Sequence, residues 1–491
     1  MNSILTVLVL GLLLAIGLDL FQENSSWIRE QLYGKQPKRK TAQVLEYFQN
    51  YERENHPDLT DCRLAWGYFA DLDVLVNGVP YMNSLGYEKP PEPVYHDFLN
   101  NMQDFAETFA FFFSKGAANE MFLDNVEDWS KVRETAFTNK RDAYYGGNAL
   151  WMAKNAARIG CRSLLGAIVD PDLKQELTDL GVETIGTVIP AEEFDVHILM
   201  EYVKTESWGK LFAPRSNRYY VNRDQQISKL EVLDAYHEEI KKYKPDFHGI
   251  GGLHLLEPHF EGSDIKDKLY KMKAYWAEAQ QRGEQIHLEL AAFNNLKFYE
   301  TLADTAIKQA NSIGLNEQEL AILHSYLSTQ SLVAVSDTNP DANAINGLIV
   351  DTLKLMIENG YEVNRMHLHS LNVHSVCYKE SHWGDGSFGL ISSALIAARM
   401  GCRVETLTED LVTLYHPGEL IGKNFAGQEE HLAFYPSNPV MKWKLDLEFI
   451  CLSIPAVICH DSQRSANLGD NISSTGLTYH RPIKQKTDSN Q

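Results

Sequence analysis

Apolar runs of strand length alternate with segments of helical period along most of this chain. The runs predict strands over residues 63–77, 162–169, 246–251, 286–291 and 365–371, and a pair of strands over 449–459. The segments between them predict helices over residues 94–113, 147–159, 229–243, 264–282, 341–359 and 388–400. This alternation is typical of a layered α/β domain built on a mainly parallel sheet.

Two segments interrupt the alternation, around residues 71–87 and 197–222. Both have the pattern of antiparallel strands inserted into the α/β frame. Such an insertion commonly serves as a lid that closes over an active-site cleft.

The charge of the chain excludes one class of function. Its 491 residues include 45 basic and 66 acidic side chains, which gives a formal net charge of −21. Phosphate backbones select basic surfaces, so general binding of nucleic acid is excluded. A local basic pocket for one small phosphate ligand is compatible with this balance. The length allows a full core without disulfide bonds.

The N-terminal 22 residues have the pattern of a targeting segment. The apolar run over residues 4–18 has the length of a signal-peptide core and is shorter than the roughly 20 residues of a spanning helix. We expect a signal peptide or N-terminal anchor over 1–22, a polar linker over 23–45 and a flexible tail over 481–491. This predicts a protein of the secretory pathway, retained in the endoplasmic reticulum or secreted, whose membrane contact is confined to the N-terminal segment. A buried N-terminal helix is the alternative.

Six cysteines are spread widely, at positions 62, 161, 377, 402, 451 and 459, without a CxxC pair. Neither a zinc ribbon nor a redox dithiol is expected from this spacing. We expect most of them to be small buried apolar residues, and an oxidising lumen leaves room for one or two disulfides.

The segment over residues 465–473 carries the clearest sign of chemistry. It follows an apolar strand over 450–458 and opens a helical stretch. A helix N-terminus with small residues offers free N–H groups to a phosphate or a developing oxyanion. Asp470 at this position fits a general base that takes the proton of an attacking hydroxyl group. The alternative is a plain N-cap or turn residue.

Two further candidates are pairs of polar residues that each include a glutamate. His287 and Glu289 lie two apart on a predicted strand and therefore point to one face, as a metal or phosphate site requires. Exposure on an edge strand is the alternative. Asn316 and Glu319 lie three apart at a helix start and share a face. A capping box would use the same two residues.

Glycines at positions 146 and 147 open a helix before Asn148, where a backbone can approach a polar ligand closely. Three histidines, His367, His369 and His374, could hold zinc, but they have no cysteine or carboxylate neighbours in the sequence, and we favour a structural role. The chain has no Walker A loop, nucleophile elbow or HExxH motif.

Six motifs occur in order between about residues 67 and 479. They are SKGAANE at 114–120, GGNA at 146–149, GGLH at 251–254, HLELA at 287–291, GLNEQEL at 314–320 and LGD at 468–470. Together they resemble the ADP-dependent glucokinase family of the ribokinase-like superfamily, in its animal form. The resemblance implies a ribokinase-like three-layer α/β/α domain over 46–480, with a smaller strand-built lid over roughly 68–90 and 195–225.

The resemblance also implies a reaction: transfer of the β-phosphate of ADP to the 6-hydroxyl of glucose, giving glucose 6-phosphate and AMP, with Mg²⁺. Asp470 would be the catalytic base, and Glu289, Glu319 and Asp470 would organise Mg²⁺, largely through water. The sugar would be held by Asp73, Glu120, Gly147 and Asn148, and the nucleotide by Asn316, Arg464, Val440, Leu468 and Gly469. Glucose and ADP are the expected partners of a monomer.

Two positions depart from the family pattern. Asn467 replaces the first glycine of the family's GxGD loop, although asparagine tolerates left-handed geometry. Phe69 replaces an asparagine that the family carries in the sugar strand, and Asp71 could compensate for it. These departures leave two alternatives open: a non-catalytic sugar- or nucleotide-binding protein of this fold, and a kinase for another hexose or a sugar phosphate. A sugar phosphate would need extra cations, with Arg218 as the position to test.

Overall fold

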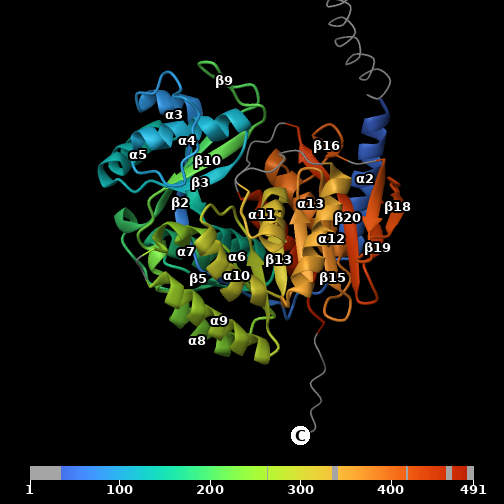
Figure 1. Cartoon of the computed structure of the whole chain (residues 1–491). Helices are drawn as coiled ribbons and strands as arrows, with labels where there is room; N and C mark the ends of the chain where they lie inside the picture. Colours follow the sequence, from blue (N-terminus) through green and yellow to red (C-terminus); the bar gives the residue numbers. More distant parts are fainter. Residues whose placement is uncertain (1–34, 262–263, 334–340, 416–417, 461–466, 484–491) are drawn as a thin grey trace, which may run out of the picture.

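The larger part of the molecule is an 11-stranded sheet with helices on both faces (Figure 1). The computed structural model describes residues 35–261, 264–333, 341–415, 418–460 and 467–483. Seven parallel strands form the centre of the sheet, in the order β14 (Arg365–His369), β13 (Ser312–Leu315), β12 (Gln285–Glu289), β11 (Phe247–Ile250), β1 (Arg63–Gly67), β5 (Arg162–Gly166) and β6 (Val182–Ile185). The expectation of a mainly parallel sheet is confirmed.

Antiparallel strands complete the other side of this sheet. They are β15 (Val373–Lys379), β20 (Phe449–Cys459), β16 (Val412–Tyr415) and β19 (Met441–Lys444). The predicted strand pair over 449–459 is wrong, because β20 is one continuous strand of 11 residues. Its run contains no glycine, asparagine or aspartate to make a tight turn, and Pro455 by itself pairs opposite Val373.

Helices cover the two faces of the sheet and make three layers (Figure 1). One layer contains α2 (Lys35–Glu54), α6 (Asn148–Ile159), α13 (Ser387–Cys402) and α14 (Leu468–Tyr479). The other contains α8 (Leu233–Tyr243), α9 (Ile265–Gln281), α10 (Leu296–Thr305), α11 (Glu317–Thr329) and α12 (Ala342–Glu358), while α7 (Pro171–Asp179) packs on β6. A hairpin of β17 (Glu419–Lys423) and β18 (Glu429–Ala433) packs on α12. The layered α/β fold is as expected.

A second sheet of five strands forms the smaller part, in the order β3 (Asn119–Phe122), β10 (Asn217–Asn222), β7 (Val196–Tyr202), β2 (Asp71–Asn77) and β4 (Asp142–Gly146). The two inserted segments do form strands, but the sheet is mixed: β2 and β7, expected to be antiparallel, are parallel neighbours. On one face Val74, Ile198 and Val221 pack against α3 (Gly78–Ser84), α4 (Met102–Lys115) and α5 (Val126–Asn139). Because side chains alternate between the two faces of a strand, the polar residues of these strands lie on the other face of the sheet. A small hairpin, β8 (Ser207–Trp208) and β9 (Leu211–Phe212), extends from it.

The N-terminal boundary of the folded part differs from the prediction. The expected polar linker ended at residue 45, but α2 begins at Lys35, and Val44, Leu45 and Phe48 are buried in the main core. Arg399 of α13 binds Glu52 of α2 through two hydrogen bonds, at 2.7 and 3.1 Å. Lys38, Arg39 and Lys40 are exposed on this helix, and such a run of charges resembles a linker in the sequence.

Both ends of the chain carry predictions that extend beyond the described residues. The signal peptide or anchor over 1–22 lies outside them, as does the first half of the linker. Of the expected tail, Arg481 is ordered against Asp246 in an ion pair of 2.7 Å, and residues after 483 lie outside. No helix in the described ranges is long and apolar enough to cross a membrane.

All six cysteines form disulfide bonds, which corrects the expectation that most are unpaired buried residues. The pairs are Cys62–Cys161, Cys377–Cys451 and Cys402–Cys459. The first two pairs join neighbouring strands, or the residues immediately before them, in the large sheet. Separations of 57 to 99 residues hide such pairings in the sequence, because only the strand order makes the partners adjacent.

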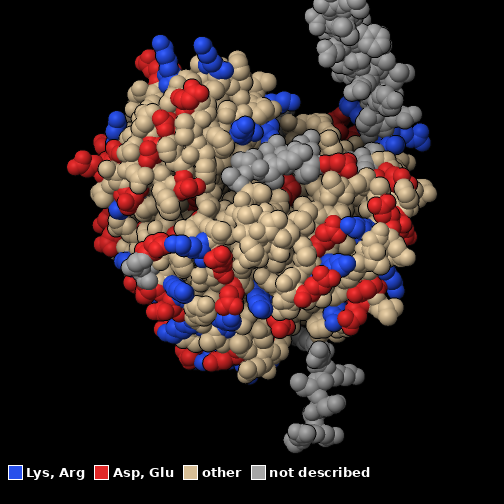
Figure 2. Space-filling model, viewed as in Figure 1, with Lys and Arg blue, Asp and Glu red and all other residues tan. Residues whose placement is uncertain are grey.

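On the surface, basic and acidic side chains are interspersed over the face shown in Figure 2. The acidic excess of the chain is therefore distributed across this face and does not gather in one block.

Candidate active site

A cavity of about 190 Å³ lies between the carboxyl ends of the parallel strands and the polar face of the small sheet. Ligands bind at this edge in open α/β sheets because strand ends and helix N-termini converge there. Nine of the residues predicted for the site line it: Asp73, Glu120, Gly147, Asn148, Glu289, Asn316, Glu319, Gly469 and Asp470. Residues from six elements, up to almost 400 positions apart, are thus brought together.

A larger groove, of about 900 Å³, lies elsewhere. Gln285, Asn311 and Asn364 line it, and these stand at or just before the first residues of β12, β13 and β14. The groove therefore opens at the amino ends of the parallel strands. In βα units the helices begin at the opposite edge of the sheet, so their N-termini do not point into this groove. We place the candidate site in the smaller cavity.

Asp470 lies in the first turn of α14 and is buried. The side-chain amide of Asn148, the first residue of α6, donates a hydrogen bond of 2.7 Å to its Oδ1 atom. Burial, with the neighbouring charge of Glu289, raises the pKa of Asp470 to about 6, although the Asn148 hydrogen bond opposes the shift. A carboxyl group with this pKa is ionised near neutral pH and still basic enough to accept a proton.

Glu289 ends β12, and its carboxylate is held from three sides. His369 Nε2 lies 3.0 Å from Oε1, His287 Nε2 lies 3.3 Å from Oε2, and the Ser473 hydroxyl donates to Oε2. Burial by itself would raise the pKa of Glu289, but the hydrogen bonds from the two histidines outweigh it and hold the pKa at about 2. Gly314 on β13 leaves room for this carboxylate, since a Cβ atom there would overlap Glu289 and Ser473. With this low pKa, Glu289 therefore stays ionised at neutral pH.

Asn316 and Glu319 form the capping box of α11. The Asn316 side chain accepts from the backbone N–H groups of Gln318 and Glu319, and Glu319 Oε2 accepts from the backbone N–H of Asn316 at 2.7 Å. Asn316 and Glu319 therefore do form the capping box that was the alternative in the sequence analysis. Both residues also line the cavity. Burial, reinforced by the charge of Glu289, raises the pKa of Glu319 to about 8. A nearby cation would bring it back into the ionised form.

Residues that the sequence analysis expects to hold a sugar form a network around His197, which sequence reasoning missed. His197 Nδ1 lies 3.0 Å from Glu120 Oε1, and His197 Nε2 lies 3.0 Å from both oxygens of Asp224. His254 Nε2 lies 2.9 Å from Glu120 Oε2. Despite burial, the nearby carboxylates of Asp224, Asp71 and Glu120 raise the pKa of His197 well above its usual value. The only sequence signal for His197 was its place in one of the two inserted segments.

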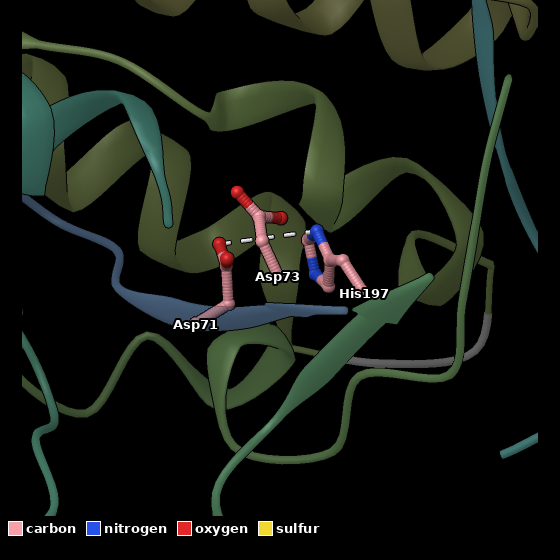
Figure 3. A group of neighbouring side chains, drawn as sticks. All are labelled: Asp71, Asp73 and His197. Atoms are coloured by element: carbon pink, nitrogen blue, oxygen red, sulfur yellow. Dashed lines mark ion pairs between the residues drawn. The ribbon is translucent and has the colours of Figure 1, made fainter. Parts of the chain in front are cut away.

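Asp71 and Asp73 stand on the same face of β2, as strand alternation without a bulge requires (Figure 3). Asp73 pairs in register with His197 on β7. Burial raises the pKa of Asp73 to about 7, and it raises the pKa of Asp71 well above its usual range. Asp71 therefore lies where it could compensate for Phe69, whose ring is buried in the main core and does not line the cavity.

The unusual residue at the start of α14 has the backbone geometry expected of it. Asn467 is the N-cap, with φ 61° and ψ 13° in the left-handed region, and its side chain lines the cavity. A glycine would adopt this conformation without strain, and asparagine is among the residues that tolerate it best.

Two other predicted residues, Leu468 and Val440, do not line the cavity. Leu468 is half-buried as the first residue of α14, and Val440 packs against the main core just before β19, so neither lines it. Arg464 lies outside the described residues. Arg218 of β10 does line the cavity, and its Nε atom donates to the Tyr220 hydroxyl at 2.8 Å.

The three predicted histidines do not form a metal site with one another. His369 binds Glu289 instead, and His374 is buried beside it on β15. Among the described residues, the group whose ligand atoms all come within 4.8 Å of one another is Asp71, Asp73 and His197.

Comparison with known proteins agrees with this geometry. Residues 62–479 match the model of the ADP-specific phosphofructokinase/glucokinase conserved region. The chain is 29% identical over 433 residues to an ADP-dependent glucokinase of Bos taurus, covering 85% of this chain and 84% of that one. It is 25% identical over 440 residues to a probable ADP-dependent glucokinase of Caenorhabditis elegans, covering 84% of each.

Among solved structures, an ADP-dependent kinase in complex with fructose 6-phosphate and ADPβS superposes with a TM-score of 0.63. It is 15% identical and covers 89% of this chain and 97% of that one, which establishes the shared fold. Since the family match spans most of the sequence and both large units of the structure, the chain belongs to the ADP-specific phosphofructokinase/glucokinase family.

Proposed function

We propose that this protein transfers the β-phosphate of ADP to the 6-hydroxyl of D-glucose, giving glucose 6-phosphate and AMP. The observation that carries the proposal is Asp470, a buried carboxyl group at a helix N-terminus that faces the cavity with a pKa of about 6. Its ionised form would take the proton of the attacking hydroxyl. The free N–H groups at the start of α14 would stabilise charge on the phosphoryl oxygens.

The acidic residues Glu289, Glu319 and Asp470 fit the magnesium ion that a nucleotide donor brings. Glu289, Glu319 and Asp470 present only oxygen donors, and Mg²⁺ prefers oxygen and keeps several of its waters. These carboxylates would hold the ion largely through water, and Glu319 would become ionised beside it. Bound Mg²⁺ would neutralise the phosphate charge that develops during transfer. Asn316 and Gly469 line the same end of the cavity and would contact the nucleotide, and we extend this role to Leu468, Val440 and Arg464.

Asp73, Glu120, Gly147 and Asn148 would hold the sugar. Carboxylates and a side-chain amide accept and donate the hydrogen bonds that neutral hydroxyl groups need. Arg218 is the one lysine or arginine among the described residues that line the cavity, and it already donates to Tyr220. A second phosphate would therefore meet mostly negative charge, which favours glucose over a sugar phosphate.

The small sheet would act as the lid. It contributes Asp73, Glu120 and Arg218 to the cavity, while the large sheet contributes Glu289, Glu319 and Asp470. Movement of one part toward the other would exclude water and align donor and acceptor. We propose that the protein acts as a monomer.

We also propose that the protein works in the secretory pathway, most simply the endoplasmic reticulum, or is secreted. Three disulfide bonds support an oxidising compartment. The apolar segment over 4–18 would direct the chain there.

The test is an assay of purified protein lacking residues 1–22 with glucose, Mg²⁺ and either ADP or ATP. We expect glucose 6-phosphate with ADP and none with ATP. If neither donor gives product, calorimetric titration with ADP decides between the alternatives. Binding without turnover would favour a non-catalytic protein or another sugar, and absence of binding would refute the nucleotide site.

A further inference from the structure

The ring of His197 lies between carboxylates on both sides. Both carboxylate oxygens of Asp224 lie 3.0 Å from Nε2, so this nitrogen carries the proton and the ring is fixed in orientation. The opposite nitrogen, Nδ1, faces Glu120 Oε1 at 3.0 Å and Asp71 Oδ2 at 3.8 Å. Histidines that ligate a metal ion usually donate their other ring N–H to a carboxylate in this way.

Asp71 also has one buried oxygen without a partner. Asp71 is 1% exposed, and its Oδ1 atom has no hydrogen-bond partner. A carboxylate oxygen buried without a partner is costly unless a proton or a cation accompanies it. Figure 3 shows Asp71 and Asp73 projecting from β2 on the side of the His197 ring. A Cβ atom on Gly146 would overlap Asp71 Oδ1 and Asp73 Oδ2, so the glycine leaves the space that both oxygens use.

The donor types and their spacing suit one kind of ion better than others. One ligand atom from each of Asp71, Asp73 and His197 lies within 4.8 Å of the others. Ligand atoms around a tetrahedral zinc ion, about 2.1 Å from the metal, are about 3.4 Å apart. The 3.0 and 3.8 Å separations from His197 Nδ1 bracket that value. One imidazole nitrogen with carboxylate oxygens suits zinc better than magnesium or calcium, which prefer oxygen alone.

We propose that His197 Nδ1, Asp71 and Asp73 bind one divalent transition ion of the zinc type, with Glu120 as the adjacent fourth carboxylate. Asp224 is a positioning residue that fixes the ring through Nε2, and an ion bound at Nδ1 would replace the proton that faces Glu120. Since Asp73 and Glu120 are also the proposed sugar ligands, the ion and the sugar exclude each other. This last point rests on the proposed function, whereas the metal site does not.

The experiment is a calorimetric titration of the purified protein with Zn²⁺, without nucleotide or Mg²⁺. We expect one ion per chain, with affinity lowered at least about tenfold in Asp71→Asn and His197→Gln, and about 10- to 100-fold in Asp224→Asn. His431→Gln is the matched control, because His431 lies 3.1 Å from Glu419 in an exposed histidine–carboxylate pair. It should bind Zn²⁺ as the unchanged protein does.

Equal zinc affinity in Asp71→Asn, His197→Gln and the unchanged protein would mean an adventitious ion only, and would overturn the proposal. If circular dichroism shows that these variants do not fold, the proposal is tested on the unchanged protein by its absorption spectrum with Co²⁺. Co²⁺ in place of Zn²⁺ should give the visible absorption of a low-coordinate ion with an imidazole ligand, and a spectrum like that of aqueous Co²⁺ would refute the site.

Competition separates this inference from the proposed function. Glucose is first titrated alone. If it does not bind, the proposed substrate is wrong, and the zinc site is then tested only by comparing the zinc affinities of the variants with that of the unchanged protein. If glucose does bind, saturating glucose should lower the apparent zinc affinity in proportion to its own occupancy. Zinc affinity that is unchanged by bound glucose would overturn the exclusion.

Discussion

The side-chain amide of Asn148 donates a hydrogen bond of 2.7 Å to Asp470 Oδ1, joining the first turns of α6 and α14 across 322 residues of sequence. Both helix N-termini therefore meet at one carboxylate. The contact stabilises the ionised form of Asp470, while burial and Glu289 favour the protonated form. The balance between these effects leads to the first two predictions.

Asp470→Asn should lower kcat by about 10²- to 10⁴-fold, because the isosteric amide cannot accept the proton of the sugar hydroxyl. Binding of ADP, measured by calorimetry, should stay within about twofold. Turnover equal to that of the unchanged protein would refute Asp470 as the base.

The pH dependence should follow the same group. Burial raises the pKa of Asp470 to about 6, so kcat/KM should fall about tenfold per pH unit below pH 6 and level off above it. Asn148→Ala removes a hydrogen bond that lowers this pKa, so the acid limb should move to higher pH. A limb at the same pH in both proteins would mean that another group titrates.

Glu319→Gln should raise the Mg²⁺ concentration needed for half-maximal activity several-fold. Glutamine can still accept the backbone hydrogen bond of the capping box, so the stability of α11 should change by less than about 0.5 kcal/mol. Glu317→Gln is the matched control, because it removes a charge from the same helical turn but does not line the cavity. Identical magnesium titrations for the two variants would contradict the assignment.

Asn467→Ala should lower the free energy of unfolding by about 1 kcal/mol, because alanine tolerates φ 61° less well than asparagine does. Asn467→Gly should retain stability, and it should raise kcat if the asparagine side chain crowds the phosphate. Urea unfolding of the two variants with steady-state kinetics checks both effects. Equal stability of the alanine and glycine variants would show that the backbone conformation there is not strained.

The double variant Cys62→Ala/Cys161→Ala should be destabilised by about 2–5 kcal/mol, since the bond closes a loop of about 100 residues in the unfolded chain. Urea unfolding of oxidised protein measures the effect. In a reducing buffer the difference between this variant and the unchanged protein should shrink. A variant as stable as the oxidised protein would show that the bond contributes little.

Much of this protein can be predicted from local sequence. The alternation of strand and helix predicted the layered fold, and the family resemblance predicted nine residues that line one cavity. The glycine before Asn148 and the spacing of Asn316 and Glu319 also predicted the starts of α6 and α11. These features are local: a period, a cap or a turn depends on residues a few positions apart, so the sequence displays it directly.

The tertiary structure decided the rest. The parallel pairing of β2 with β7, the disulfide partners and the His197–Asp224 contact depend on which strands become neighbours. Likewise, Asp71 and His197 carry no sign of each other in the sequence, because 126 residues separate them. Burial then sets the charge of each group, raising the pKa of Asp73 and Glu319 while hydrogen bonds lower that of Glu289. Sequence determined the elements and the residue types, but long-range pairing and desolvation, which exist only in the folded chain, decided which residues act together.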